Sequence, residues 1–113
     1  VLPRLIGFAK ASAIMMTGEK ISATDAERWG MIYRCVADDL FEETITRIAQ
    51  ELSLMPTHAL GLTKAALNAS MNNTLEQQLQ LEEHFQIEAG GTNDYSEGVT
   101  AFMEKRKAVF VGR

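Results

Sequence analysis

At 113 residues the chain has the length of one domain, and it should bury roughly two thirds of its unfolded surface. Its 46% hydrophobic and 23% charged residues indicate a globular protein and exclude a disordered one. The formal net charge of -4 argues against a general nucleic-acid binder, which would carry a basic excess. No apolar run approaches a membrane span and the N-terminus lacks a signal-peptide layout, so we expect a cytoplasmic protein without membrane partners.

The first two predicted helices lie between about Leu5 and Gly30. One runs from about Leu5 to Thr17 and stops at Gly18, because glycine readily ends a helix in the left-handed conformation. A shorter one follows Ser22, a good N-cap residue, and is closed by Gly30. The apolar residues of the first helix recur at helical steps, and they are Ile6, Ala9, Ala13 and Met16.

Residues 31–36, MIYRCV, are predicted to form one short extended segment. They contain the only cysteine, Cys35, which cannot form an intrachain disulfide and fits a reducing compartment. In this apolar run we expect a packed, unreactive thiol. Neither His58 nor His84 has a companion at metal-ligand spacing, so we expect no metal site.

Three further helices are predicted from residue 38 to residue 91. Asp38 opens the first, whose carboxylates form a solvated face rather than an acid/base pair, since nothing apolar surrounds them to raise a pKa. Pro56 suits the first turn of the next, which runs to about Met71. The capping box at residues 74–77 starts the last, which ends at Gly90-Gly91. The predicted fold is therefore mainly α, with about six helices and at most one short extended segment.

In the final stretch, Asp94 to Arg113, a helix would gather four apolar residues into a stripe, and a basic cluster follows directly at the end of that stripe. An aromatic ring beside fixed positive charge suits a ligand with an aromatic base and phosphates. The alternative is a terminal helix docked by its apolar face, with cations at its C-terminal end because the helix dipole favours them there. Residue types alone favour this alternative. The stripe consists of Tyr95, Val99, Phe102 and Met103, and the cluster of Lys105, Arg106 and Lys107.

Four stretches carry a family resemblance. The run EGVTAFMEKRKAVFVGR resembles the C-terminal signature of the enoyl-CoA hydratase/isomerase family, the crotonases. The stretches LPRLIG, TGEKISATDAERWGMIYRCV and LGLTKAALN match that family in the same order and spacing. Together they cover nearly the whole chain, and four ordered matches are far more specific than one.

The resemblance implies a fold and a reaction. Residues 1–113 would be the C-terminal helical lobe of the crotonase fold, which takes part in trimer contacts. In the family, two backbone N–H groups hold the carbonyl oxygen of an acyl-CoA thioester and stabilise an enolate, while one or two carboxylates act as acid and base. These groups lie upstream of Val1 in the family's layout. We therefore expect no catalytic residue here, an N-terminal catalytic core outside this chain, and no activity from it alone.

Only the coenzyme-holding end carries over to particular residues. In the family, the aromatic residue of the AF pair and the first lysine of EKR lie near the adenine and 3′-phosphate of CoA, often a CoA bound to the neighbouring subunit. Here they are Phe102 and Lys105, whereas Arg106 and Lys107 are interpreted as helix-end charges. The implied substrate is a coenzyme A thioester without a further cofactor, and the complete enzyme would self-associate as a trimer or a dimer of trimers.

Within the family, GMIYRCVADD, NNTLEQQLQLEEHFQ and GTNDYSEG are most similar to the ring-1,2-epoxyphenylacetyl-CoA isomerases of bacterial phenylacetate degradation. The residues that set subfamily chemistry are not in this chain, so hydration, isomerisation and dehalogenation stay open. The alternative function is a free-standing helical interaction domain without catalysis. An exposed apolar face on the chain would favour the enzyme fragment, and a closed monomer without a large patch would favour the interaction domain.

Overall fold

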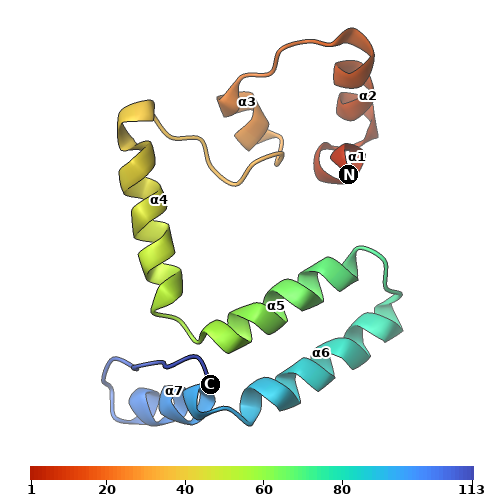
Figure 1. Ribbon diagram of the computed structural model, residues 1–113. Coiled ribbons are helices and arrows are strands. Elements are labelled where there is room, and N and C mark those ends of the chain that lie inside the picture. The colour runs from red at the N-terminus through yellow and green to blue at the C-terminus, as the bar shows by residue number, and fades with distance from the viewer. The chain divides into compact units, whose positions relative to one another are not determined.

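The computed structural model describes residues 1–113 and consists of α-helices joined by turns and loops, with no β-strand (Figure 1). This confirms the mainly α prediction. The chain divides into two compact units, Val1–Thr44 and Ile45–Arg113, with the boundary inside one helix. The helices are α1 (Leu2–Ile6), α2 (Phe8–Thr17), α3 (Ala23–Arg28), α4 (Asp38–Ser53), α5 (Thr57–Ser70), α6 (Leu75–Gly90) and α7 (Asn93–Met103).

The N-terminal unit begins with two helices where the sequence predicted one. Gly7 interrupts the predicted Leu5 to Thr17 helix, because its φ of 82° lies outside the helical region. Its N–H bonds the Pro3 carbonyl at 3.0 Å and ends α1, while its carbonyl accepts from the Ala11 N–H at 3.1 Å and begins α2. A helical spacing of apolar residues cannot reveal such a break, since it continues across the glycine.

The stops and caps predicted for this unit are confirmed. Gly18 ends α2 in the left-handed conformation, with φ 67°. Ser22 caps α3, and its Oγ accepts from the Asp25 N–H at 3.0 Å. Residues 31–36 form bends and irregular backbone rather than a strand, and Cys35 in them is a free, half-buried thiol.

Few side chains of the N-terminal unit are buried. Those below the surface are Ile6, Ala11 and Ala26, whereas Met16 is 86% exposed instead of lying in a core stripe. Its interior is therefore small, and most apolar side chains of the unit face outward.

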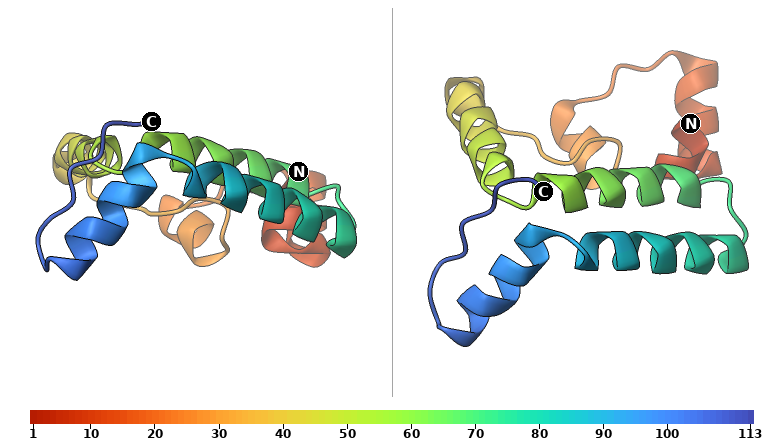
Figure 2. Two further views of the ribbon diagram at one scale, coloured as in Figure 1. Left: turned by 90° about the horizontal axis from the view of Figure 1, so that it is seen from below. Right: turned by 60° about the horizontal axis from the view of Figure 1, so that its bottom comes forward.

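In the C-terminal unit, α5 and α6 form an antiparallel pair that runs side by side in both views of Figure 2. At one end of the pair, the Gln78 side-chain amide donates to the Ala66 carbonyl at 3.2 Å. At the other end, His58 Nε2 lies 2.9 Å from Glu88 Oε1. The predicted capping box is present: the Gln77 N–H reaches Thr74 Oγ1 at 3.3 Å, and the Gln77 amide oxygen accepts from the Thr74 N–H at 2.9 Å.

The helix predicted to carry the apolar stripe ends at Met103, just before the basic cluster. There α7 ends, and residues 104–113, which we call the tail, turn back along α7 (Figure 1). Asp94, only 2% exposed, holds the tail at the start of α7. Its two carboxylate oxygens accept from the Val111 and Gly112 N–H groups at 2.7 and 2.8 Å, and its own N–H donates to the Arg113 carbonyl at 3.0 Å.

The chain exposes much more surface than a closed globular protein of its size. Its accessible surface is 8971 Å². Two separately folded domains with the lengths of these units would together expose about 7,400 Å², and the unfolded chain about 18,000 Å². The chain thus buries about half of its unfolded surface, less than the two thirds expected from its length. None of its helices has the length and apolarity needed to cross a membrane.

Candidate functional site

The aromatic part of the predicted site lies on the last turn of α7. Phe102 is 82% exposed, and the other stripe residues, Tyr95, Val99 and Met103, are exposed as well. Ala101, on another side of the same helix, is buried. Within residues 1–113 the stripe is therefore not docked against another element of the chain. A ring this exposed has its face open to a ligand or to another protein surface.

Lys105 occupies the turn that ends α7. Its N–H donates to the Phe102 carbonyl at 3.2 Å, and the next N–H, that of Arg106, donates to the Ala101 carbonyl at 3.0 Å. This pair of bonds is a Schellman motif, whose turning residue is usually glycine because it must be left-handed. Lys105 has φ 53°, and it is the one non-glycine residue with positive φ. The conformation costs about 1 kcal/mol for a residue with a Cβ.

Arg106 belongs to an ion-pair cluster that the sequence analysis missed. Its guanidinium donates two hydrogen bonds to the Glu97 carboxylate, of 2.6 and 2.9 Å, and a third to the Glu104 carboxylate, of 2.6 Å. Glu97 also accepts from the Val109 N–H at 2.8 Å. Together, Arg106 and the Val109 N–H lower the pKa of Glu97 to about 2, with the Arg106 hydrogen bond as the largest cause. Hydrogen bonds to Glu97 and then Glu104 raise the pKa of Arg106 above its usual value.

Arg106, which the sequence analysis interpreted as a helix-end charge, thus also pairs with Glu97 and Glu104. On a continuous helix, residues 97 and 106 would be nine positions apart and on opposite faces. The turn at Lys105 brings them together, so the pairing could be recognised only by predicting where α7 ends. No ion pair engages Lys105 or Lys107, and both side chains are exposed. Of the three cations, Arg106 is held by carboxylates, whereas the ammonium of Lys105 is available to an anion.

An apolar groove of about 460 Å³ lies beside Phe102. The tail supplies one of its walls through Phe110, which comes close to α7 at Gly98. A Cβ placed on Gly98 would lie 3.6 Å from the Phe110 ring, so the ring rests directly on the helix. The remaining lining comes from the start of α5, the end of α6, and α7 with its N-cap, namely Pro56, Ala59, Gln86, Ala89, Thr92, Asp94, Tyr95, Gly98 and Val99.

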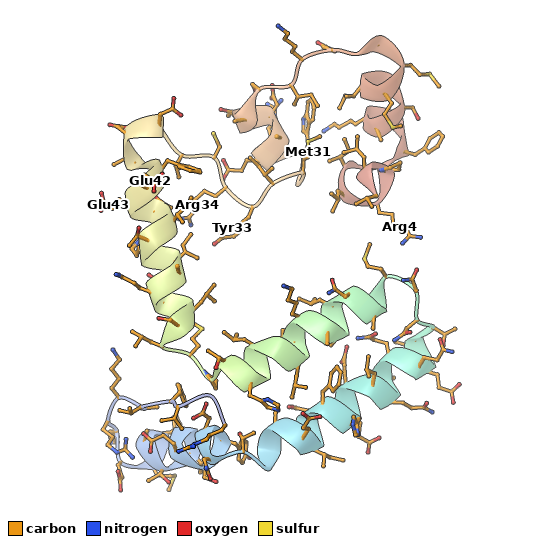
Figure 3. All side chains as sticks on the ribbon, in the orientation of Figure 1. Arg4, Met31, Tyr33, Arg34, Glu42 and Glu43 are labelled. Atoms are coloured by element: carbon orange, nitrogen blue, oxygen red, sulfur yellow. The ribbon has the colours of Figure 1, made fainter.

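The other titratable residues considered in the sequence do not assemble into a reactive site. Glu42 and Glu43 project from α4 and are exposed, as predicted for a solvated face (Figure 3). His58 pairs with Glu88 across α5 and α6, and His84 is exposed beside the Phe85 ring. No group of three or more histidine, cysteine, aspartate or glutamate side chains is placed to hold a metal ion.

Comparison with known proteins shows which family the chain belongs to. The profile of the enoyl-CoA hydratase/isomerase family matches residues 1–113. The chain is 42% identical to the 1,2-epoxyphenylacetyl-CoA isomerase of Escherichia coli K12 over all its 113 residues, which cover 43% of that protein. It is 41% identical to a probable enoyl-CoA hydratase of Rhodobacter capsulatus, with 99% of this chain and 44% of the relative covered. The chain thus spans less than half the length of these relatives.

Solved structures show the same helical arrangement. An enoyl-CoA hydratase from Bacillus anthracis matches 99% of this chain with a TM-score of 0.93 and 34% identity, over 43% of its own length. An enoyl-CoA hydratase from Mycobacterium smegmatis matches 96% with a TM-score of 0.91 and 27% identity, over 42% of its length. The chain therefore has part of the fold of these two proteins.

Proposed function

This chain belongs to the enoyl-CoA hydratase/isomerase family, and from that premise we propose that it is the C-terminal helical region of an acyl-CoA enzyme. The enzyme would act on a coenzyme A thioester, without a further cofactor, by stabilising an enolate in an oxyanion hole. The oxyanion-hole donors and the acid/base carboxylates would belong to a part of the protein outside residues 1–113. By itself this chain would be inactive.

The observation that carries this proposal is the exposed apolar surface. Fully or mostly exposed apolar side chains occur in both units, and the total of 8971 Å² exceeds what two closed domains of these lengths expose by about 1,600 Å². Such an excess favours a segment that packs against more protein. We propose that the additional protein is the catalytic part of the same enzyme together with neighbouring subunits, in a trimer or a dimer of trimers. The alternative, a free-standing interaction domain, predicts a closed surface and is disfavoured.

We further propose that Phe102 and Lys105 form the coenzyme-binding end. Three features support this assignment: the Phe102 ring is open to contact, the Lys105 ammonium has no carboxylate partner, and one turn of backbone joins them. The ring would stack on the adenine of CoA, and the ammonium would neutralise its 3′-phosphate. The bound CoA could belong to the same or to the neighbouring subunit.

For the reaction, isomerisation of a ring epoxide of phenylacetyl-CoA ranks first. Its support is the 42% identity to the Escherichia coli isomerase over the full chain, together with the three subfamily stretches. The 41% identity to the Rhodobacter capsulatus protein supports enoyl-CoA hydration nearly as well. Assaying the complete enzyme with the epoxide and with crotonyl-CoA distinguishes the two reactions. A cytoplasmic location stays a prediction from sequence.

The coenzyme site is tested by Lys105→Ala in the complete enzyme. Loss of one charged phosphate contact should raise the Kd for CoA about tenfold, as measured by calorimetry. Lys107→Ala removes a neighbouring exposed charge and should leave the Kd unchanged. With 3′-dephospho-CoA as the ligand, the difference between wild type and Lys105→Ala should disappear. An unchanged Kd for CoA in Lys105→Ala would overturn the assignment.

A further inference from the structure

Lys105 combines a strained backbone conformation with an exposed side chain. A lysine stands at a left-handed position that glycine would occupy without strain, and it is exposed, so packing does not explain it. Residues in sparsely populated backbone conformations persist where the surroundings hold them, and they are concentrated at ligand sites. The surroundings of Lys105 should therefore contain the group that holds it.

Arg106 is that group, because its guanidinium fixes the chain on both sides of the turn. One bond reaches Glu104, which directly precedes Lys105. Two more reach Glu97, which lies well inside α7. A further bond from the same guanidinium reaches the Lys107 carbonyl at 3.2 Å. The planar Arg106 side chain thus joins Glu104, which precedes Lys105, to Lys107, which follows the turn, and joins both to α7 through Glu97.

We propose that Arg106, through Glu97 and Glu104, is a positioning residue for coenzyme binding: it holds the Lys105 turn closed so that the ammonium is presented beside Phe102. The proposal rests on the proposed function of Lys105 and Phe102. The proposal assigns Arg106 no contact with the coenzyme, since four of its five N–H donors already bind two carboxylates and a carbonyl. Its contribution is the fixed placement of the neighbouring ammonium, which lowers the ordering cost of binding.

A purely structural role would instead make Arg106 an anchor of the tail. The chain offers a control for this, because the tail has a second anchor at Asp94, which binds Val111 and Gly112. Asp94→Asn weakens that anchor without touching the turn at Lys105. Arg106→Gln weakens the turn and leaves the Asp94 anchor in place. Tail anchoring and positioning of Lys105 can therefore be separated.

The experiment is a double-mutant cycle in the complete enzyme, with the Kd for CoA and the KM and kcat for the acyl-CoA substrate as readouts. Arg106→Gln should raise Kd and KM about fivefold and leave kcat unchanged. Combined with Lys105→Ala, it should cause no further loss, because its effect passes through Lys105. Arg106→Lys, which cannot bind Glu97 with the planar two-bond geometry, should restore only part of the affinity. Asp94→Asn should leave Kd and KM unchanged.

Each result decides a different claim. An unchanged Kd in Lys105→Ala removes the coenzyme site and with it the proposed role of Lys105. If Lys105→Ala raises the Kd for CoA but Arg106→Gln leaves it unchanged, the positioning role alone is overturned. The same holds if the increases in Kd of the two single variants multiply in the double variant. If Arg106→Gln does not fold, Glu104→Gln takes its place, because it removes one exposed partner and keeps the Glu97 bonds. It should raise Kd by about twofold, and an unchanged Kd would count against the proposal.

Discussion

At the scale of single residues, two glycines of the C-terminal unit lie close to side chains that the fold brings against them. Gly112 has φ 79°, and a Cβ there would lie 2.6 Å from Thr57 Oγ1 at the start of α5. Gly98 is different, since it is helical and its Cβ would make an ordinary contact with Phe110. The two positions therefore differ: the left-handed turn and the close approach of Thr57 require a glycine at residue 112, whereas residue 98 has room for a Cβ.

We expect Gly112→Ala to lower the free energy of unfolding by about 2 kcal/mol, because it combines a left-handed alanine with a clash. Gly98→Ala should be neutral or should stabilise by up to about 1 kcal/mol, because alanine is the better helix former. Urea denaturation of the complete enzyme measures both. Equal effects of the two substitutions would contradict this description of the tail.

The Glu97 carboxylate should make the tail sensitive to acid. Its folded pKa is depressed to about 2, so its stabilising effect is complete above the ordinary carboxyl pKa and is lost as pH falls toward 2. We expect wild type to be more stable than Glu97→Gln at neutral pH, with a difference that is constant above about pH 5 and shrinks below it. Thermal unfolding across pH measures the difference. A stability difference between wild type and Glu97→Gln that widens as the pH falls would contradict the lowered pKa of Glu97.

At the scale of elements, local signals located most helix ends correctly. The Ser22 cap, the Gly18 stop and the Thr74 capping box act within a few residues, so their chemistry is readable in the sequence. The interruption at Gly7 and the end of α7 at Met103 were missed. At Gly7 the apolar spacing continues through the break, and at Met103 a lysine takes the place of the expected glycine.

The capping box gives a prediction at this scale. Thr74→Ala removes the hydroxyl that accepts from the Gln77 N–H, and it should cost about 1 kcal/mol of stability. Thr63 is a matched control, because its hydroxyl only donates to the Ala59 carbonyl inside α5. Thr63→Ala should change stability by less than about 0.5 kcal/mol. Urea denaturation of the complete enzyme distinguishes them, and a larger loss at Thr63 would contradict the assignment of the cap.

At the scale of the whole molecule, exposed apolar surface is the dominant property. A chain that buries only about half of its unfolded surface lacks the core that stabilises a domain of this length. We expect residues 1–113 produced alone to bind a hydrophobic dye and to associate beyond the 12.5 kDa monomer. Light scattering with dye fluorescence measures both properties. A monodisperse monomer without dye binding would instead support the interaction domain.

The intact mass of the protein made from its native gene tests the same proposal in the cell. A mass of about twice 12.5 kDa would fit the coverage of less than half of its relatives. A mass near 12.5 kDa would make the interaction domain the leading function. This measurement needs no assumption about how the separate chain folds.

The sequence by itself determined the helical content, most of the caps and the family, because these depend on short-range patterns and ordered motifs. It also selected Phe102 and Lys105, through the resemblance. Only the tertiary structure decided that the tail turns back after Met103, since the pairing of Glu97 with Arg106 joins residues that a continuous helix would place on opposite faces. It likewise decided how little of the chain is buried, because burial depends on which faces find partners, and periodicity within a helix shows only that a face is apolar.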